Sequence, residues 1–386
     1  MQYRKFGKLD WQVSALGFGF MRLPTIGGDA GHIDQEKATE MLRTAIDAGL
    51  NYVDTAYVYH NQTSETALGI ALLDGYRDKV RIATKLPVWL AKDSGDFDRM
   101  LDEELQRLQT DHVDYYLMHS LDRGGWAKVQ KLGLLQKAED AVKDGRIRYI
   151  GFSFHDKLDI FKQIVDGYDK WTFCQIQYNY MDIEFQAGTA GLRYAAEKDL
   201  AVVIMEPLRG GRLAADLPAA QPIWAEAKTQ HTPADWALQW LWNQPEVSVV
   251  LSGMNTLEQV EQNLASADRS GIGSLKQEEL DMISRVRAAL ADLSPIGCTR
   301  CEYCLPCPNG VNIPGVFDYY NRIAMFNDIE GPRFQYKLFM DEDKRASQCI
   351  QCGECLSKCP QGIPISDWMP VIADVLEKGQ PYQTAV

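Results

Sequence analysis

Residues 50–65 read LNYVDTAYVYHNQTSE, and this stretch joins an apolar strand to a polar loop. Its first residues have the pattern of a short buried strand, which we predict to end at Asp54. Tyr59 follows in the loop, before a helix start at Ser64. A carboxyl group and a phenol group are therefore predicted to lie close together where the chain emerges from the core.

Two further polar residues occupy the corresponding place in the next two units of the chain. Lys85 ends the next predicted strand, and His119 ends the one after it. Each step along the chain has about the length of one strand and one helix. Since all strand C-termini of a βα barrel open on one face, this spacing predicts that Asp54, Tyr59, Lys85 and His119 surround one pocket.

Strand-like and helix-like segments alternate along most of the chain, which predicts parallel strands covered by helices. Residues 1–20 have the pattern of a hairpin, which we expect to plug the barrel floor, followed by a first barrel strand. Beyond the strand at Asp54, strands are predicted at Val80–Lys85, Val113–His119, Tyr149–Ser153, Phe173–Tyr178, Ala201–Glu206 and Val247–Ser252. Helices are predicted at Gln35–Ala48, Thr66–Leu73, Phe97–Leu108, Ala127–Lys143, Leu158–Val165, Gln186–Lys198, Pro233–Leu241 and Leu257–Ala267. Eight strands are enough to close a barrel.

The alternative to a closed barrel is an open, doubly wound sheet. Its first turn should carry a G-x-G-x-x-G fingerprint, and none occurs there. We therefore predict an α/β fold, a (β/α)8 TIM barrel over residues 1–293 that ends with a helix at Lys276–Leu293. Ser294–Gly297 then breaks the pattern, and residues 294–386 are predicted to form a second, small α-helical domain.

Two cysteine runs, CTRCEYCLPCP and CIQCGECLSKCP, dominate the second domain. Three cysteines spaced C-x2-C-x2-C wrap three corners of a cubane, and a following Cys-Pro supplies a remote ligand, so the runs predict two [4Fe-4S] clusters. Zinc is the alternative, but zinc modules use separate cysteine pairs. The expected ligands are Cys298, Cys301, Cys304, Cys307, Cys349, Cys352, Cys355 and Cys359. We favour a crossed assignment, in which Cys359 completes the first cluster and Cys307 the second.

Charge and composition exclude several classes of function. The net charge of -13 and the lack of a basic run argue against nucleic-acid binding. The first residues lack the apolar core of a signal peptide, and no window is long and apolar enough to span a membrane. We therefore expect a cytoplasmic protein, in which its nine cysteines would rarely form disulfides.

The four polar residues of the barrel suit carbonyl chemistry. A tyrosine hydroxyl titrates near 10, so it needs a nearby cation, here Lys85, to stabilise its phenolate. Asp54 can hold the lysine ammonium, and His119 can orient a carbonyl oxygen by a hydrogen bond. The set suits protonation of a ketone or aldehyde oxygen while hydride arrives at the carbon.

The motif DTAYVY, with its downstream lysine and histidine, resembles the aldo-keto reductase superfamily over about residues 1–293. The resemblance implies that Asp54, Tyr59, Lys85 and His119 form the catalytic tetrad, with Tyr59 as general acid and base. It also implies a bound NAD(H) or NADP(H). The positions that match its nicotinamide, pyrophosphate and adenosine contacts are Ser153, Gln175, Met205, Pro207, Leu208, Gly210, Arg212, Ser252, Gly253, Gln259, Gln262 and Asn263.

The sequence departs from this family at the nucleotide site. Phe154 replaces the asparagine that often follows the matching serine, and Met205 stands where many members stack an aromatic ring on the nicotinamide. Asn255 and Gln259 lack the cation that would pair with a 2′-phosphate, which favours NADH. Trp89 and Trp126 follow two of the strands and are explained equally well as pocket walls or as packing.

Residues 294–386 resemble a two-cluster ferredoxin domain with a helical insert at Val316–Phe339, so the whole chain resembles the iron-sulfur branch of the aldo-keto reductases. The expected function is nicotinamide-dependent reduction of an aldehyde or ketone, or the reverse alcohol oxidation, with the clusters either coupled to it or structural. An electron-transfer protein that uses the barrel as a docking scaffold is the alternative. A small-molecule substrate and a redox partner protein are the expected partners.

Overall fold

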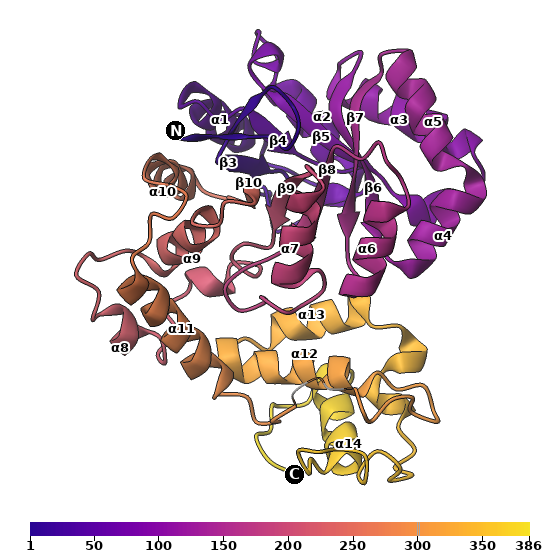
Figure 1. The fold of residues 1–386 in the computed structure, drawn as a ribbon, viewed down its shortest axis with the longest axis vertical. Helices are drawn as coiled ribbons and strands as arrows, with labels where there is room; N and C mark the ends of the chain where they lie inside the picture. The colour runs from indigo at the N-terminus through magenta and orange to yellow at the C-terminus, as the bar shows by residue number, and fades with distance from the viewer. Residues whose placement is uncertain (299, 301) are drawn as a thin grey trace. The chain divides into compact units, whose positions relative to one another are not determined.

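The computed structural model describes residues 1–298, 300 and 302–386, and it divides into two compact units (Figure 1). The first unit comprises Met1–Ala215 and His231–Leu280, and the second comprises Asp216–Gln230 and Asp281–Val386. The division that we expect at residues 293 and 294 stays a prediction. Among the described residues, no helix has the length and apolar character needed to cross a bilayer.

Eight parallel strands of the first unit form a closed barrel, which confirms the predicted fold class. The ring runs in the order β10-β3-β4-β5-β6-β7-β8-β9, so each strand pairs with its neighbours in the chain and the last strand pairs with the first. The strands are β3 (Leu16–Gly19), β4 (Tyr52–Asp54), β5 (Arg81–Leu86), β6 (Val113–Leu121), β7 (Ile147–Phe154), β8 (Phe173–Gln177), β9 (Ala201–Met205) and β10 (Val247–Ser252). Because every pairing is parallel, all strand C-termini open on one face of the barrel.

Helices lie around this ring of strands, and each buries an apolar face against it (Figure 1). They are α1 (Gln35–Asp47), α2 (Ser64–Ala71), α3 (Gly95–Leu108), α4 (Arg123–Leu132), α5 (Leu134–Lys143), α6 (Leu158–Asp166), α7 (Gly188–Glu197), α9 (Pro233–Trp242) and α10 (Leu257–Asp268). The single helix predicted over residues 127–143 was wrong. Gly133 adopts a left-handed conformation, with φ of 65°, and ends α4 before α5 begins.

The N-terminal hairpin plugs the barrel floor, as predicted. Strands β1 (Tyr3–Lys5) and β2 (Gln12–Ser14) pair antiparallel. Phe6, in the turn between them, is fully buried in the cluster of side chains that fills the barrel interior, and its ring centroid lies 4.7 Å from that of Tyr115. This layer closes the end of the barrel opposite the strand C-termini.

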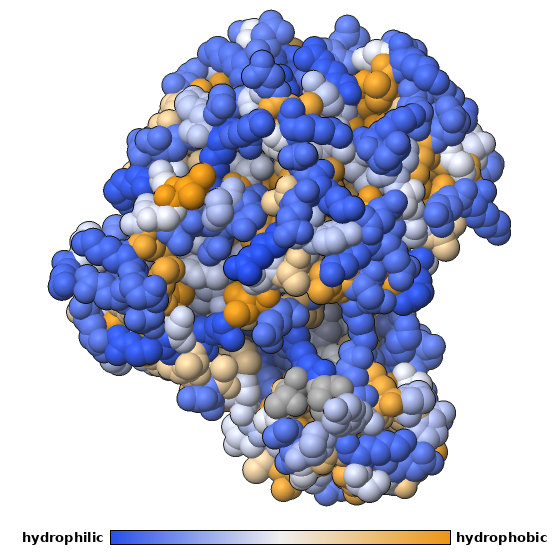
Figure 2. Space-filling model, viewed as in Figure 1, coloured by the Kyte–Doolittle hydropathy of each residue, from blue (hydrophilic) through white to orange (hydrophobic). Residues whose placement is uncertain are grey.

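The second unit is mainly helical. Helix α11 (Gln277–Ala291) leads into it, and α8 (Gln221–Trp224), α12 (Ile313–Phe326), α13 (Glu330–Phe339) and α14 (Ile365–Leu376) belong to it. Helices α12, α13 and α14 pack on one another around Tyr320, Tyr336 and Met369. The helical insert predicted at Val316–Phe339 is two helices, and α14 was not predicted. The face in Figure 2 is mostly hydrophilic, with small separate hydrophobic areas, as expected for a chain of net charge -13.

A buried carboxyl group lies between α3 and the strands. Glu104 on α3 has no exposed surface, and its carboxyl group lies next to the buried hydroxyl of Tyr116. Burial, together with the nearby carboxylate of Glu65, raises the pKa of Glu104 well above its ordinary value. Glu104 is therefore neutral in the fold at pH values where the unfolded chain ionises it.

Glu104→Gln is expected to stabilise the protein increasingly as the pH rises. Above the unfolded pKa of about 4.5, ionisation favours the unfolded wild type by about 1.4 kcal/mol per pH unit, up to the raised folded pKa. The glutamine variant does not lose stability in this way. The difference between its thermal midpoint and that of the wild type should therefore widen from pH 6 to pH 8. The control is Glu103→Gln, since the pKa of Glu103 is lowered and its offset should stay constant. A constant offset for Glu104→Gln would mean that Glu104 is ionised in the fold.

Candidate active site and cysteine-lined cavities

The four polar residues predicted to share a pocket lie together at the C-terminal end of the barrel. Asp54 ends β4, and Tyr59 begins the short helical turn η1 (Tyr59–Gln62) in the loop that follows. Lys85 lies near the end of β5. His119 lies in β6, which continues for two residues beyond the predicted end. The parallel strands bring these side chains to one face because their C-termini share it.

Lys85 is the centre of this group. Its fully buried ammonium donates hydrogen bonds to Asp54 Oδ1 at 2.7 Å and to the carbonyl oxygen of Thr55 at 2.6 Å. The same Nζ lies 4.8 Å from the ring centroid of Tyr59. The Tyr59 ring in turn meets the imidazole of His119 edge-on, with centroids 5.9 Å apart. The four side chains thus form one continuous cluster.

Burial sets the protonation state of the phenol. It raises the pKa of Tyr59 above the ordinary value of 10, and Lys85 opposes this shift without cancelling it. Burial lowers the pKa of Lys85, but Asp54 and Tyr59 outweigh it, so that the net shift is upward. At neutral pH the site therefore holds a protonated tyrosine beside a charged lysine.

His119 is neutral in this setting. Burial, the charge of Lys85 and the neighbouring His155 lower the pKa of His119 well below 6.5. Its Nδ1 has no hydrogen-bond partner among the described residues. Trp89 contacts the imidazole at a tilt, with ring centroids 5.0 Å apart, and is 48% exposed. It is therefore a wall of this site, whereas Trp126 is buried against Trp171 and belongs to the packing.

Ser153 and Gln175 form the next part of the same face. They are paired across β7 and β8, so their side chains point the same way, and both are almost fully buried. Ser153 Oγ accepts a hydrogen bond from the Ser120 backbone N–H at 2.7 Å and keeps its own proton to donate. Gln175 Oε1 has no partner among the described residues, and its Nε2 lies 3.8 Å from Met205 Sδ. A buried amide oxygen and a hydroxyl are thus available to a carboxamide.

The two arginines of the loop after β9 have different partners. Arg209 is buried and forms an ion pair with Asp182 at 3.1 Å, so its charge is neutralised within the protein. Arg212 donates to the Arg209 carbonyl oxygen and remains beside Gly210. Gly210 has a φ of 71°, which favours glycine, and Pro207 and Leu208 begin the turn. The Arg209–Asp182 pair ties this loop to the loop after β8.

Sequence reasoning missed Arg22, which follows β3 and reaches the same loop. Its Nη2 lies 3.6 Å from Glu206 Oε1, and a Cβ on Gly210 would lie 3.4 Å from that nitrogen. A Cβ on Gly253 would lie 3.3 Å from the Arg22 side chain. The position of Arg22 just after a barrel strand was the one feature of the sequence that could have indicated its place at this face.

The remaining predicted nucleotide contacts lie at the end of β10 and on α10. Ser252 Oγ accepts a hydrogen bond from Asn263 Nδ2 at 2.9 Å, which joins the strand to the helix. Gln259 Oε1 accepts from the Asn255 backbone N–H. Gln262 is exposed and donates to Glu258 Oε1 on its own helix. The structure thus brings these residues together at the C-terminal end of β10, where their side-chain amides already have hydrogen-bond partners in the protein.

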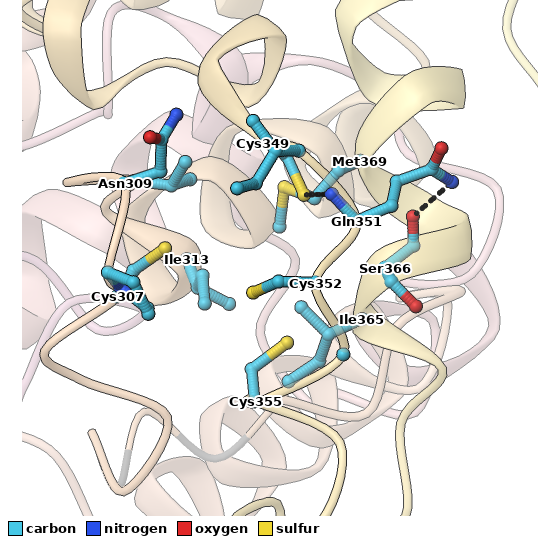
Figure 3. Close-up of a pocket in the computed structure, with 14 residues that line it drawn as sticks. Cys307, Asn309, Ile313, Cys349, Gln351, Cys352, Cys355, Ile365, Ser366 and Met369 are labelled. Atoms are coloured by element: carbon cyan, nitrogen blue, oxygen red, sulfur yellow. Dashed lines mark hydrogen bonds between the residues drawn. The ribbon is translucent and has the colours of Figure 1, made fainter.

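Four cysteines of the second unit line one cavity of about 370 Å³. Cys349, Cys352 and Cys355 come from the second run, and Cys307 comes from the first. Figure 3 shows their sulfur atoms facing a common space. Ile313 and Met369 complete an apolar wall, and the Gln351 backbone N–H donates to Cys349 Sγ at 3.4 Å. Cysteine thiols are the usual ligands of iron-sulfur clusters, so this lining suits one, although no group of three or more His, Cys, Asp or Glu among the described residues is arranged to hold a single metal ion.

A second cavity of about 310 Å³ has a similar lining. Cys298 and Cys304 come from the first run, and Cys359 comes from the second. Cys301, the expected fourth ligand, lies outside the described residues. The described cysteines therefore divide between the two cavities in the crossed manner, although the ligand assignment itself stays a prediction.

Comparison with known proteins gives the relationships of both units. The model of the aldo/keto reductase family matches residues 15–287, and that of a 4Fe-4S dicluster domain matches residues 297–363. The L-galactose dehydrogenase of Arabidopsis thaliana is 28% identical, over 76% of this chain and 97% of its own length. An aldo-keto reductase of Klebsiella pneumoniae, solved in complex with NADPH, has a TM-score of 0.59 and 26% identity, over 73% of this chain and 93% of its own. The holo form of an aldo-keto reductase of Bacillus halodurans has a TM-score of 0.61 at 24% identity, over 74% and 96%.

Proposed function

Because the chain belongs to the aldo/keto reductase family and carries a 4Fe-4S dicluster domain, we propose that it is an oxidoreductase that interconverts a carbonyl compound and its alcohol with a nicotinamide nucleotide. The observation that carries this proposal is the buried Lys85 ammonium, which is bonded to Asp54 and lies beside a protonated Tyr59. The NADPH complex of the Klebsiella pneumoniae relative supports the choice of cofactor.

In this proposal Tyr59 is the general acid. It donates its hydroxyl proton to the carbonyl oxygen, and the charge of Lys85 stabilises the phenolate that remains. Asp54 holds Lys85 in place and balances its charge. Neutral His119 hydrogen-bonds the carbonyl oxygen and orients it next to Tyr59. Ser153 and Gln175 would hold the nicotinamide, which when bound would supply the hydride for the carbonyl carbon and accept it in the reverse direction.

The residues of the barrel face fit a nicotinamide dinucleotide. Ser153 and Gln175 offer a hydroxyl proton and an unpaired amide oxygen to the carboxamide, next to Met205. Arg212, with Gly210 of the same loop, offers charge and close backbone approach to the pyrophosphate, and Arg22 adds a second guanidinium there. Since Asn255 and Gln259 carry no charge, we propose that NADH binds at least as tightly as NADPH.

We propose that the two cysteine-lined cavities hold two [4Fe-4S] clusters, one in each. Cys307, Cys349, Cys352 and Cys355 would hold one cluster, and Cys298, Cys301, Cys304 and Cys359 the other. A bound cluster transfers one electron at a time, whereas hydride transfer moves two. The clusters therefore either serve a redox partner protein or stabilise the second unit.

The test is an anaerobic titration of the reconstituted protein with NADH and then with NADPH. Nucleotide binding, followed by fluorescence, is expected at micromolar concentrations, with NADH no weaker than NADPH. Cluster absorbance and electron paramagnetic resonance are recorded in the same titration. Reduced clusters would place nicotinamide and iron on one electron path, and oxidised clusters would indicate a self-contained reductase. If neither nucleotide binds at about 1 mM, the barrel is a docking scaffold for electron transfer and the proposal fails.

A further inference from the structure

A cavity of the barrel unit lies at the end opposite the tetrad. It has a volume of about 530 Å³ and is formed where β5, β6 and β7 begin, next to the N-terminal hairpin. Its lining consists of Trp11, Asn51, Arg77, Asp78, Lys79, Val80, Arg81, His112, Asp114 and Arg148. We propose that this cavity binds a phosphate group, either as the free ion or as the head group of a small phosphate monoester.

The charge of the lining is the first argument. Arginine and lysine contribute four cations, and aspartate contributes two carboxylates, on a chain whose net charge is -13. Lys79 is paired outside the cavity with Asp47, at 3.0 Å. The surplus that remains comes from the arginines, and a local positive site on an acidic protein is a place where anions concentrate.

One buried carboxylate is shared between two of these arginines. Asp114 lies 3.0 Å from Arg77 and 3.3 Å from Arg148, and it also accepts the Ile82 backbone N–H. Most donors of Arg77 are already used, because it also bonds Val80, Thr110 and His112. Arg77 and Asp114 are therefore the fixed wall of the cavity, and Arg148 retains N–H donors for a ligand.

Among the cations that line the cavity, Arg81 has the positive charge that is least neutralised by carboxylates. Its Nη1 donates to the Tyr115 hydroxyl at 3.0 Å, and it has no carboxylate within ion-pair distance among the described residues. The guanidinium lies over the Trp11 ring at 3.9 Å, which covers one face and leaves the in-plane N–H edge for other partners. A planar edge of paired N–H donors matches two oxygens of a phosphate.

Arg81 and Arg148 come from strands on either side of β6, so their guanidinium groups enter the cavity from two sides. The three arginines of the lining exceed its two aspartates by one positive charge, which favours an anion, and the paired N–H donors of two guanidinium groups match the several oxygens of a phosphate better than chloride. The cavity is open to solvent, so the organic part of a monoester can extend out of it.

The experiment is isothermal titration calorimetry of the holoprotein with inorganic phosphate, with NADH at saturation so that the nucleotide site is filled. One saturable site with a millimolar Kd is expected. Arg81→Gln and Arg148→Gln should each weaken binding at least tenfold. The matched control is Arg193→Gln, which removes an exposed charge on α7 and should leave Kd unchanged. Since Arg148 is half-exposed, its variant remains informative even if Arg81→Gln fails to fold.

A titration with glycerol phosphate, carried out in the same way, distinguishes free phosphate from a phosphate monoester as the ligand. Tighter binding than inorganic phosphate would identify a monoester, and equal binding would identify phosphate itself. No saturable heat with either compound, or a Kd that neither cavity variant changes, would overturn the proposal. The readout is binding rather than turnover, so failure here is distinct from failure of the proposed reductase activity.

Discussion

Tyr59→Phe is expected to lower kcat for carbonyl reduction by about 10²–10⁴-fold, while the affinity for NADH changes less than about twofold. The substitution removes one hydroxyl from a ring that remains packed beside Lys85 and His119. The proton for the carbonyl oxygen then has no donor, and the charge that develops on that oxygen is left to His119 alone. Steady-state kinetics and a fluorescence titration with NADH measure the two quantities on one preparation.

Tyr57→Phe is the matched control for this prediction. Tyr57 is also buried, but its hydroxyl donates to Glu103 at 2.5 Å, on α3. Its loss should cost some stability and leave kcat within about threefold. If Tyr59→Phe retained more than a tenth of the wild-type rate, the proton would have another source, and His119 would be the next candidate.

The pH dependence of the wild type follows from the same two residues. The pKa of Tyr59 is raised above 10, and that of His119 is lowered well below 6.5. Both groups therefore keep one protonation state between about pH 7 and pH 9, which agrees with the acid role of Tyr59 and the neutral role of His119. The rate of reduction should accordingly be flat over this range.

The barrel and the tetrad cluster were predictable because they depend on local patterns and topology. Short apolar runs mark buried parallel strands, and the closed ring places their C-termini on one face. The proximity of Asp54, Lys85 and His119 can therefore be predicted without any knowledge of their side-chain contacts. The structure places Lys85 2.7 Å from Asp54, as a shared strand-end position suggests.

Features that depend on pairing between distant loops were not predictable. Asp182 from the preceding loop neutralises the charge of Arg209, and no local pattern in the sequence indicates this pair. Arg22 reaches the same region from the start of the chain, and no periodicity marks it. Gly133 divides a helix because of its backbone conformation, which a helical pattern that tolerates glycine does not reveal.

The crossed cysteine assignment leads to a prediction with an effect of similar size. Each [4Fe-4S] cluster contributes four irons, so the wild type should hold about eight. Replacing one ligand by alanine is expected to remove the irons of one cluster. Cys307→Ala and Cys352→Ala should therefore each leave about four irons, and so should Cys359→Ala, whichever assignment is correct.

Double variants distinguish the two assignments. Cys307 and Cys352 line one cavity, so the crossed assignment predicts that losing both removes only one cluster and leaves about four irons. Cys359 lines the other cavity, so the Cys352→Ala/Cys359→Ala double variant should leave almost none. If each run bound its own cluster, the two results would be exchanged. Anaerobic iron and sulfide analysis measures both, and Cys174→Ala is the control, because that buried barrel cysteine should leave the iron content at the wild-type level.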